Sequence, residues 1–236
     1  MNDTAPGWYG KVPALGDFAS RRLPTAFVQR WDEWLQRCIA ASRSQLGAGW
    51  LDAYLTSPLW RFMLLPGTCS DGAWAGVMMP SVDKVGRHFP LTIACQLGGG
   101  DALVADSWYA GVEDIALATL DINFPAEQLD QRLAALEPPT KPVDAAMSVH
   151  GGDLAHWWND PLPGEFALSP ASLSQCGALF AAARARLFAS TGFGRSLWWS
   201  GDDASARLHG FLGLPPPESF ATLLTGAAAA SSQATP

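Results

Sequence analysis

A change in hydrophobic period is the feature that most limits what this chain can fold into. From Pro24 to Leu46 apolar residues recur every three or four positions, which predicts an amphipathic helix. From Trp60 to Leu65 the side chains follow the two-residue period of a strand, and two more apolar runs occupy 73–79 and 89–97. The last run is nearly continuous, so we expect it to lie inside a sheet rather than at its edge.

The rest of the chain continues this alternation of helical and extended patterns. We expect helices at 50–55, 103–120, 126–136, 171–189 and 217–225, strands at 143–149, 196–200 and 207–212, and a loop at 150–170. Early strands, interspersed helices and late strands predict an α/β fold with a single mixed β-sheet domain and helices packed on the sheet, a layered α/β/α sandwich. We expect one domain over 1–226 and a disordered tail over 227–236.

Composition narrows the classes of protein to which the chain can belong. It has 11 tryptophans among 236 residues, which predicts an aromatic core, with stacking platforms for bases or sugars as the alternative. The formal net charge of −7 is concentrated after residue 90, and acidic surface repels phosphate backbones, so we expect no nucleic-acid partner. Four scattered cysteines are expected to be reduced and buried.

The chain lacks the patterns of a membrane or exported protein. No apolar run approaches the roughly 18 residues that would suggest a membrane span, so we expect no membrane insertion. The polar start shows no basic segment followed by an apolar one, as a signal peptide would. These features predict a cytoplasmic protein.

Two motifs invite a catalytic or ligand-binding interpretation. Ser81, Asp83 and His88 carry the groups of a hydrolase triad, but triad members normally come from separate elements, so we favour a structured loop in which Asp83 accepts backbone N–H bonds. The turn Gly98–Asp101 lies between a strand and a helix, as phosphate-binding turns do, yet it lacks their lysine and hydroxyl. We expect Asp101 to cap the next helix.

A metal site is a further alternative. His150, Asp153 and His156 are the residue types that bind zinc, at three-residue steps. Such steps bring side chains together on a helix, which Gly151-Gly152 disfavours. We therefore expect no metal and no cofactor.

Arginines and lysines in two glycine-containing segments are the strongest candidates for function. If the strands bring 16–22 and 81–88 together, these cations would share one surface suited to carboxylates or phosphates. The alternative is that Arg21–Asp17 and Arg87–Asp83 are internal pairs that fix the shape of the loops. The candidate partner-binding residues are Asp17, Phe18, Arg21, Arg22, Asp83, Lys84 and Arg87.

At these same segments the chain resembles the TagF/ImpM family of bacterial type VI secretion systems. The matching motifs occur in order over most of the chain: Gly7-Trp-Tyr-Gly-Lys-Val-Pro, Gly16-Asp-Phe, Arg21-Arg-Leu-Pro, Trp31-Asp-Glu-Trp-Leu-Gln, Trp60-Arg-Phe, Pro80-Ser-Val-Asp-Lys-Val-Gly-Arg, Phe89-Pro-Leu, Ser196-Leu-Trp-Trp and Gly213-Leu-Pro. Several linked motifs are more specific than any one of them.

The resemblance implies a non-enzymatic accessory protein that restrains assembly of the secretion system after translation. It implies binding to the forkhead-associated scaffold protein of that system, and a serine/threonine phosphatase of the same system as a further partner. The competing hypothesis is a small hydrolase, or a metal- or anion-binding protein, that uses the 81–88 loop or the region of His150 and His156.

Overall fold

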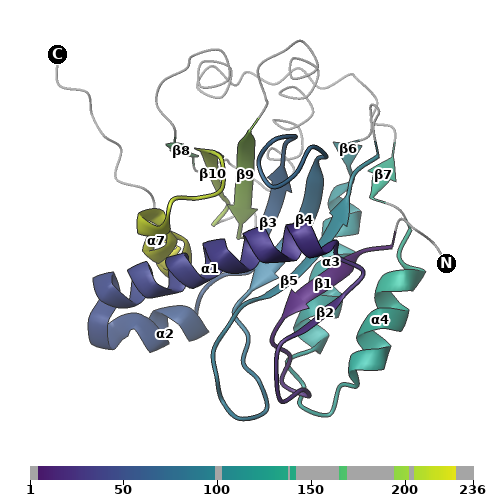
Figure 1. Ribbon diagram of the computed structural model, residues 1–236, viewed down its shortest axis with the longest axis horizontal. Coiled ribbons are helices and arrows are strands. Elements are labelled where there is room, and N and C mark those ends of the chain that lie inside the picture. The colour runs from purple at the N-terminus through teal and green to yellow at the C-terminus, as the bar shows by residue number, and fades with distance from the viewer. Residues whose placement is uncertain are drawn as a thin grey trace.

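In the computed structural model, one antiparallel sheet forms the centre of the molecule (Figure 1). The structure describes residues 5–98, 103–137, 139–141, 165–168, 194–201 and 205–226. Among these residues eight strands form the sheet in the order β2-β1-β5-β4-β3-β9-β10-β8, and β6 pairs separately with β7. The strands are β1 Gly7–Gly10, β2 Ala19–Arg21, β3 Trp60–Leu64, β4 Trp74–Met79, β5 Leu91–Gln96, β6 Leu103–Val104, β7 Thr140–Lys141, β8 Glu165–Leu168, β9 Arg195–Ser200 and β10 Arg207–Leu212.

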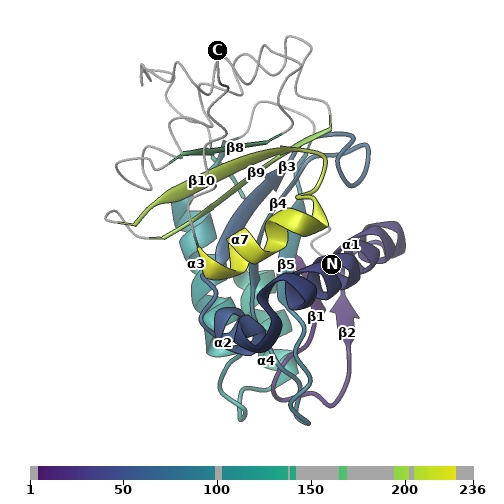
Figure 2. The ribbon, with the colours of Figure 1, turned by 90° about the vertical axis from the view of Figure 1, so that its left-hand side faces the viewer.

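Helices cover both faces of the sheet (Figure 2). The two-residue period of β3 explains why: Phe62 and Leu64 point into one core cluster, whereas Met63 points into the other. The first cluster packs against α1, α2 and α7, and the second against α3 and α4. The helices are α1 Thr25–Leu46, η1 Gly47–Gly49, α2 Trp50–Leu55, α3 Asp106–Ala118, α4 Ala126–Ala135, η2 Pro217–Ser219 and α7 Phe220–Thr225.

The long helix α1 follows the sequence pattern closely. Pro24 precedes its first turn, and Gly47, at a φ of +52°, ends it in a backbone conformation that favours glycine. The apolar stripe of the helix is buried, as an amphipathic helix on a sheet requires.

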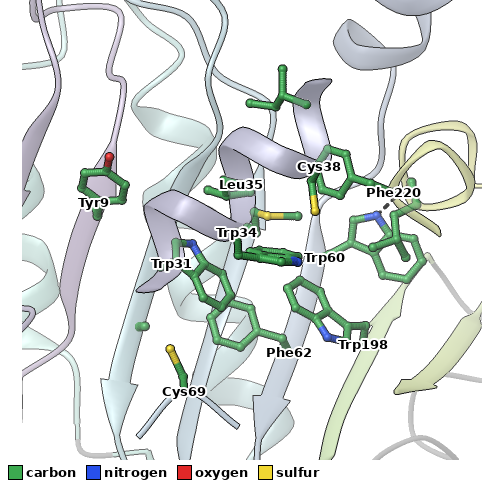
Figure 3. Packing of buried hydrophobic residues seen from close by; sticks show 14 of the residues in the cluster. Tyr9, Trp31, Trp34, Leu35, Cys38, Trp60, Phe62, Cys69, Trp198 and Phe220 are labelled. Carbon is green, nitrogen blue, oxygen red and sulfur yellow. Dashed lines mark hydrogen bonds between the residues drawn. The ribbon is translucent and has the colours of Figure 1, made fainter. Parts of the chain in front are cut away.

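Tryptophans form much of the core under α1, as Figure 3 shows. The ring centroids of Trp31 and Trp34 are 4.7 Å apart, and that of Phe62 lies 5.1 Å from both Trp31 and Trp198. The indole N–H of Trp31 donates to Thr92 Oγ1 at 2.9 Å, so this polar group is not left unpaired by burial. The aromatic-core prediction is confirmed for these residues.

The predicted fold class, an α/β domain with helices layered on one sheet, is confirmed, but the sheet is not mixed in strand direction. Every pairing between the described strands is antiparallel. The strand predicted at 89–97 is present as β5 and is interior, between β1 and β4. The helices predicted at 50–55, 126–136 and 217–225 and both late strands are also confirmed.

Some predictions need correction. The strand β8 lies within the segment 150–170 that was expected to be a loop, and its pairing with β10 accounts for it. The helix α3 begins at Asp106 with Ala105 as its N-cap, after the strand β6, so Asp101 does not cap it. The strand expected at 143–149, the helix at 171–189 and the tail at 227–236 lie outside the described residues.

Candidate functional site

Of the two segments expected to form a surface, 16–22 and 81–88, only the start of the first, Gly16-Asp17, contacts the second. We call residues 11–18 and 81–88 the loop pair. Because β1 pairs with β5, the loop that follows β1 lies beside the loop that precedes β5. The backbone N–H of Lys84 donates to Leu15 O at 2.9 Å, and Arg87 Nη2 donates to Gly16 O at 2.7 Å.

A buried carboxylate, that of Asp83, holds the loop pair together. It accepts hydrogen bonds from the Lys11 ammonium, from Arg87 Nε at 2.6 Å and from the backbone N–H groups of Val85 and Arg87 at 3.0 and 2.9 Å. Burial alone would raise the pKa of Asp83, but the hydrogen bonds from Lys11 and Arg87 outweigh it and hold that pKa well below its usual range. The expected backbone bonds and the expected Arg87–Asp83 pair are confirmed.

The outer surface of the loop pair combines apolar and cationic groups. Phe18 is 44% exposed, although its ring packs edge-on against Phe89 and lies under the Lys11 ammonium at 4.5 Å. Val85 is 68% exposed at the tip of the other loop, next to the exposed Lys84. Both large apolar side chains are thus held open to solvent by a rigid framework.

The remaining two arginines contact a different element. Arg22 Nη1 lies 3.0 Å from Asp130 Oδ1 of α4, and Arg21 Nε lies 3.7 Å from Asp130 Oδ2. The indole of Trp8 donates to the same carboxylate at 2.9 Å. Arg21 is paired in register with Trp8 and is the last residue of β2, beyond the end of the loop pair.

The predicted four-cation surface is therefore divided. Lys84 and Arg87 belong to the loop pair with Asp83, and Arg87 Nη2 lies 3.6 Å from Asp17 Oδ1. Arg21 takes Asp130 as its ion-pair partner, so the expected Arg21–Asp17 pair is wrong. The sequence around Arg21 does not predict Asp130 as its partner, because the two residues are 109 positions apart along the chain.

Comparison with known proteins identifies the family. A sequence model described as "TagF N-terminal domain, Type VI secretion system-associated" matches residues 7–136. The chain belongs to the TagF N-terminal domain family. It is also similar to PA0076 from Pseudomonas aeruginosa PAO1, known from a crystal structure, with 38% sequence identity, 94% of each chain covered and a TM-score of 0.69. No curated protein sequence matches it.

The TagF match includes every residue of the loop pair and of α1, and also Asp130 with its partners Trp8, Arg21 and Arg22. The family resemblance drawn from the sequence motifs is therefore confirmed, together with an association with type VI secretion. In the described part of the chain, no helix is both long and apolar enough to cross a membrane.

The alternative hydrolase site is not assembled in the TagF fold. Ser81 Oγ donates to Lys11 O at 2.8 Å, and the Asp83 carboxylate is occupied by the donors given above. His88 packs against the rings of Trp50 and Tyr54, with the Tyr54 centroid at 5.6 Å. Ser81 is not hydrogen-bonded to His88, and His88 is not hydrogen-bonded to Asp83, so these three residues do not form a catalytic triad.

The metal alternative concerns other segments. Within the described ranges no group of three His, Cys, Asp or Glu residues is arranged to hold a metal ion. The candidate ligands His150, Asp153 and His156 lie outside the described residues, as do residues 99–101 of the Gly98–Asp101 turn.

Proposed function

We propose that this chain is a non-enzymatic, cytoplasmic accessory protein that restrains assembly of a type VI secretion system after translation. It does so by binding the forkhead-associated scaffold protein of that system, with a serine/threonine phosphatase of the system as a further partner. The observation that carries the proposal is the match of residues 7–136 to a family described as type VI secretion system-associated. The chemistry of the loop pair supports protein binding rather than catalysis.

The rigidity of the loop pair supports this role. Ordering a flexible loop on binding costs conformational entropy, so a surface that is already fixed retains more of its contact energy. The Asp83 carboxylate fixes the loop through four donors, and the two hydrogen bonds to Leu15 O and Gly16 O fix its neighbour. The protein thus presents Phe18 and Val85 in one arrangement.

The composition of the surface defines the partner that would fit it. Exposed apolar side chains surrounded by charged ones are typical of protein interfaces, where the apolar centre excludes water and the charged rim guides association. Val85 and Phe18 supply apolar area, and Lys84 supplies a positive charge on a chain of net charge −7. The complementary surface on the scaffold would carry an apolar recess with acidic residues near it.

The test is a binding measurement with the purified scaffold and substitutions that leave the loop framework intact. Lys84→Glu and Val85→Asp change side chains that point to solvent, so both variants should fold normally. We expect each to weaken scaffold binding by about tenfold, or about 1.4 kcal/mol, as an interface residue of moderate importance does. The matched control is Ile122→Asp, which changes another exposed apolar residue, 59% exposed and located after α3.

A cellular assay links binding to restraint. Overproduction of the wild-type chain should lower the number of assembled secretion sheaths, and the Lys84→Glu/Val85→Asp double variant should lose this effect while Ile122→Asp keeps it. A double variant with wild-type scaffold affinity would remove the loop pair as the binding surface. A wild-type chain that binds no scaffold at all would remove the proposed partner.

A further inference from the structure

A groove lies between α1 and the proline-rich turn that follows β10. It has a volume of about 290 Å³, near the lower end for ligand sites. Its lining residues are Arg30, Glu33, Trp34, Arg37, Thr68, Leu214, Pro215, Pro216 and Pro217. Four of these are apolar residues of one short segment, and two are arginines of one helix face.

The groove is separate from the loop pair. Thr68 belongs to the turn that connects β3 to β4, whereas residues 81–88 follow the other end of β4. The two sites therefore lie at opposite ends of the same strand. Any ligand of the groove would act independently of the surface proposed above for the scaffold.

The walls of the groove are preformed. The buried indole of Trp34 donates to Pro215 O at 2.7 Å, and Gln45 Nε2 donates to Glu218 O at 3.1 Å, so α1 holds the turn at two points. Pro216 has φ −62° and ψ 146°, the polyproline II conformation. Consecutive prolines restrict the backbone strongly, so the wall keeps its shape without a ligand.

The two arginines of the groove form no ion pair with a carboxylate of the described residues. Arg37 Nε donates to the backbone carbonyl of Glu33 at 3.3 Å. Both arginines line the groove. The groove is thus a concave, cationic site.

The spacing of the charges indicates what fits. Arg30 and Arg37 are seven residues apart, which places them about 10 Å apart along the helix. A polyproline II peptide advances about 9 Å in three residues and returns to the same face. Glu33 lies between the two arginines and disfavours an anion at the midpoint. We propose that the groove binds an extended peptide of a protein partner that carries anionic side chains three residues apart, a spacing of about 9 Å in the polyproline II conformation.

The probe is a peptide of this design, followed by NMR titration of the full chain. The peptide Glu-Pro-Pro-Glu-Pro-Pro should shift the indole signal of Trp34 and the side-chain signals of both arginines. Gln-Pro-Pro-Gln-Pro-Pro should bind at least about tenfold more weakly, because charge-assisted hydrogen bonds to arginine are lost. A version with phosphoserine in place of both glutamates distinguishes phosphate from carboxylate recognition, and either source of anion supports the site.

Substitutions locate the binding. Arg30→Gln and Arg37→Gln should each weaken the glutamate peptide by about tenfold, since each removes one charged contact. Glu33→Gln should strengthen it by a few fold, because a like charge is removed. Arg132→Gln, the same change at an exposed arginine of α4, is the matched control and should leave the affinity unchanged. Unaltered melting temperatures in all four variants establish that they are folded.

Three results would overturn the proposal. The glutamate and glutamine peptides could bind equally, which would leave no role for the anions. Arg132→Gln could weaken binding as much as Arg30→Gln, which would show general electrostatic attraction without a defined site. Inorganic phosphate alone could cause the same shifts at the same concentration as the peptides, which would make the groove a small-anion site rather than a peptide site.

Discussion

A buried histidine should make the folded protein sensitive to mild acid. His209 of β10 is 1% exposed, its Nδ1 has no hydrogen-bond partner among the described residues, and its ring packs edge-on against Trp60 and parallel to Phe211. Burial and, to a smaller extent, the charge of Arg207 lower the pKa of His209 from 6.5 to about 4. The imidazole is therefore neutral in the folded protein at pH values where it is protonated in the unfolded chain.

The size of the effect follows from this difference. Because the folded pKa is depressed, the contribution to stability is present above about pH 6.5 and is lost as the pH falls toward about 4. The full shift corresponds to about 3 kcal/mol, at about 1.4 kcal/mol per pKa unit. Between about pH 7 and about pH 5 the linked loss in the free energy of unfolding is about 2 kcal/mol.

The assay is urea unfolding followed by tryptophan fluorescence at the two pH values. His209→Leu removes the titrating group and keeps an apolar side chain of similar size, so its loss on acidification should be smaller than that of the wild type by about 2 kcal/mol. His88→Gln, a change to a partly exposed histidine, should retain the wild-type loss. An equal pH effect in His209→Leu and the wild type would refute the reasoning.

Three further predictions concern thiols and the loop framework. Burial raises the pKa of Cys38 to about 12 and those of the other two described cysteines to about 11, so a Cys176→Ser variant should react with a disulfide reagent at neutral pH only after unfolding. Lys11→Met leaves the Asp83 carboxylate buried with one donor fewer, and should lower the melting temperature far more than the same change at an exposed lysine. Gly10→Ala should destabilise by more than ~1 kcal/mol, because φ is +133° and a Cβ would clash with a backbone carbonyl, whereas Gly16→Ala meets nothing within 4 Å.

The helices and strands that could be predicted from the sequence are those long enough to repeat their hydrophobic period several times. The helix α1 offers six turns of apolar spacing, so its limits are clear to within one residue. The strands β1 and β2 were not predicted, because they span four and three residues in a segment rich in glycine and proline. The strand β1 depends on pairing with β5, which is more than about 80 residues away along the chain, and β2 in turn pairs with β1.

The candidate site shows the same division between local and distant partners. The hydrogen bonds that Asp83 accepts from the backbone N–H groups of Val85 and Arg87 could be predicted. Acidic side chains at turns commonly accept from N–H groups two to four residues away. Lys11 could not be assigned to Asp83, since 72 residues separate them and only the β1–β5 pairing brings them together. The sequence therefore predicted a fixed loop and its Arg87–Asp83 pair, but not the Lys11 ammonium that also holds Asp83.

The groove on α1 depends still more on tertiary structure. The helical pattern places Arg30 and Arg37 away from the core, which is the usual position of arginines on an amphipathic helix and indicates no site. They become part of a site only because Trp34, on the adjoining buried face, takes Pro215 O as its hydrogen-bond acceptor and so holds the proline-rich turn beside them. A buried indole N–H needs a hydrogen-bond acceptor, and the acceptor that Trp34 uses is 181 residues further along the chain. The hydrogen-bonding requirement of one core residue thus creates the concavity in which two surface charges can act together.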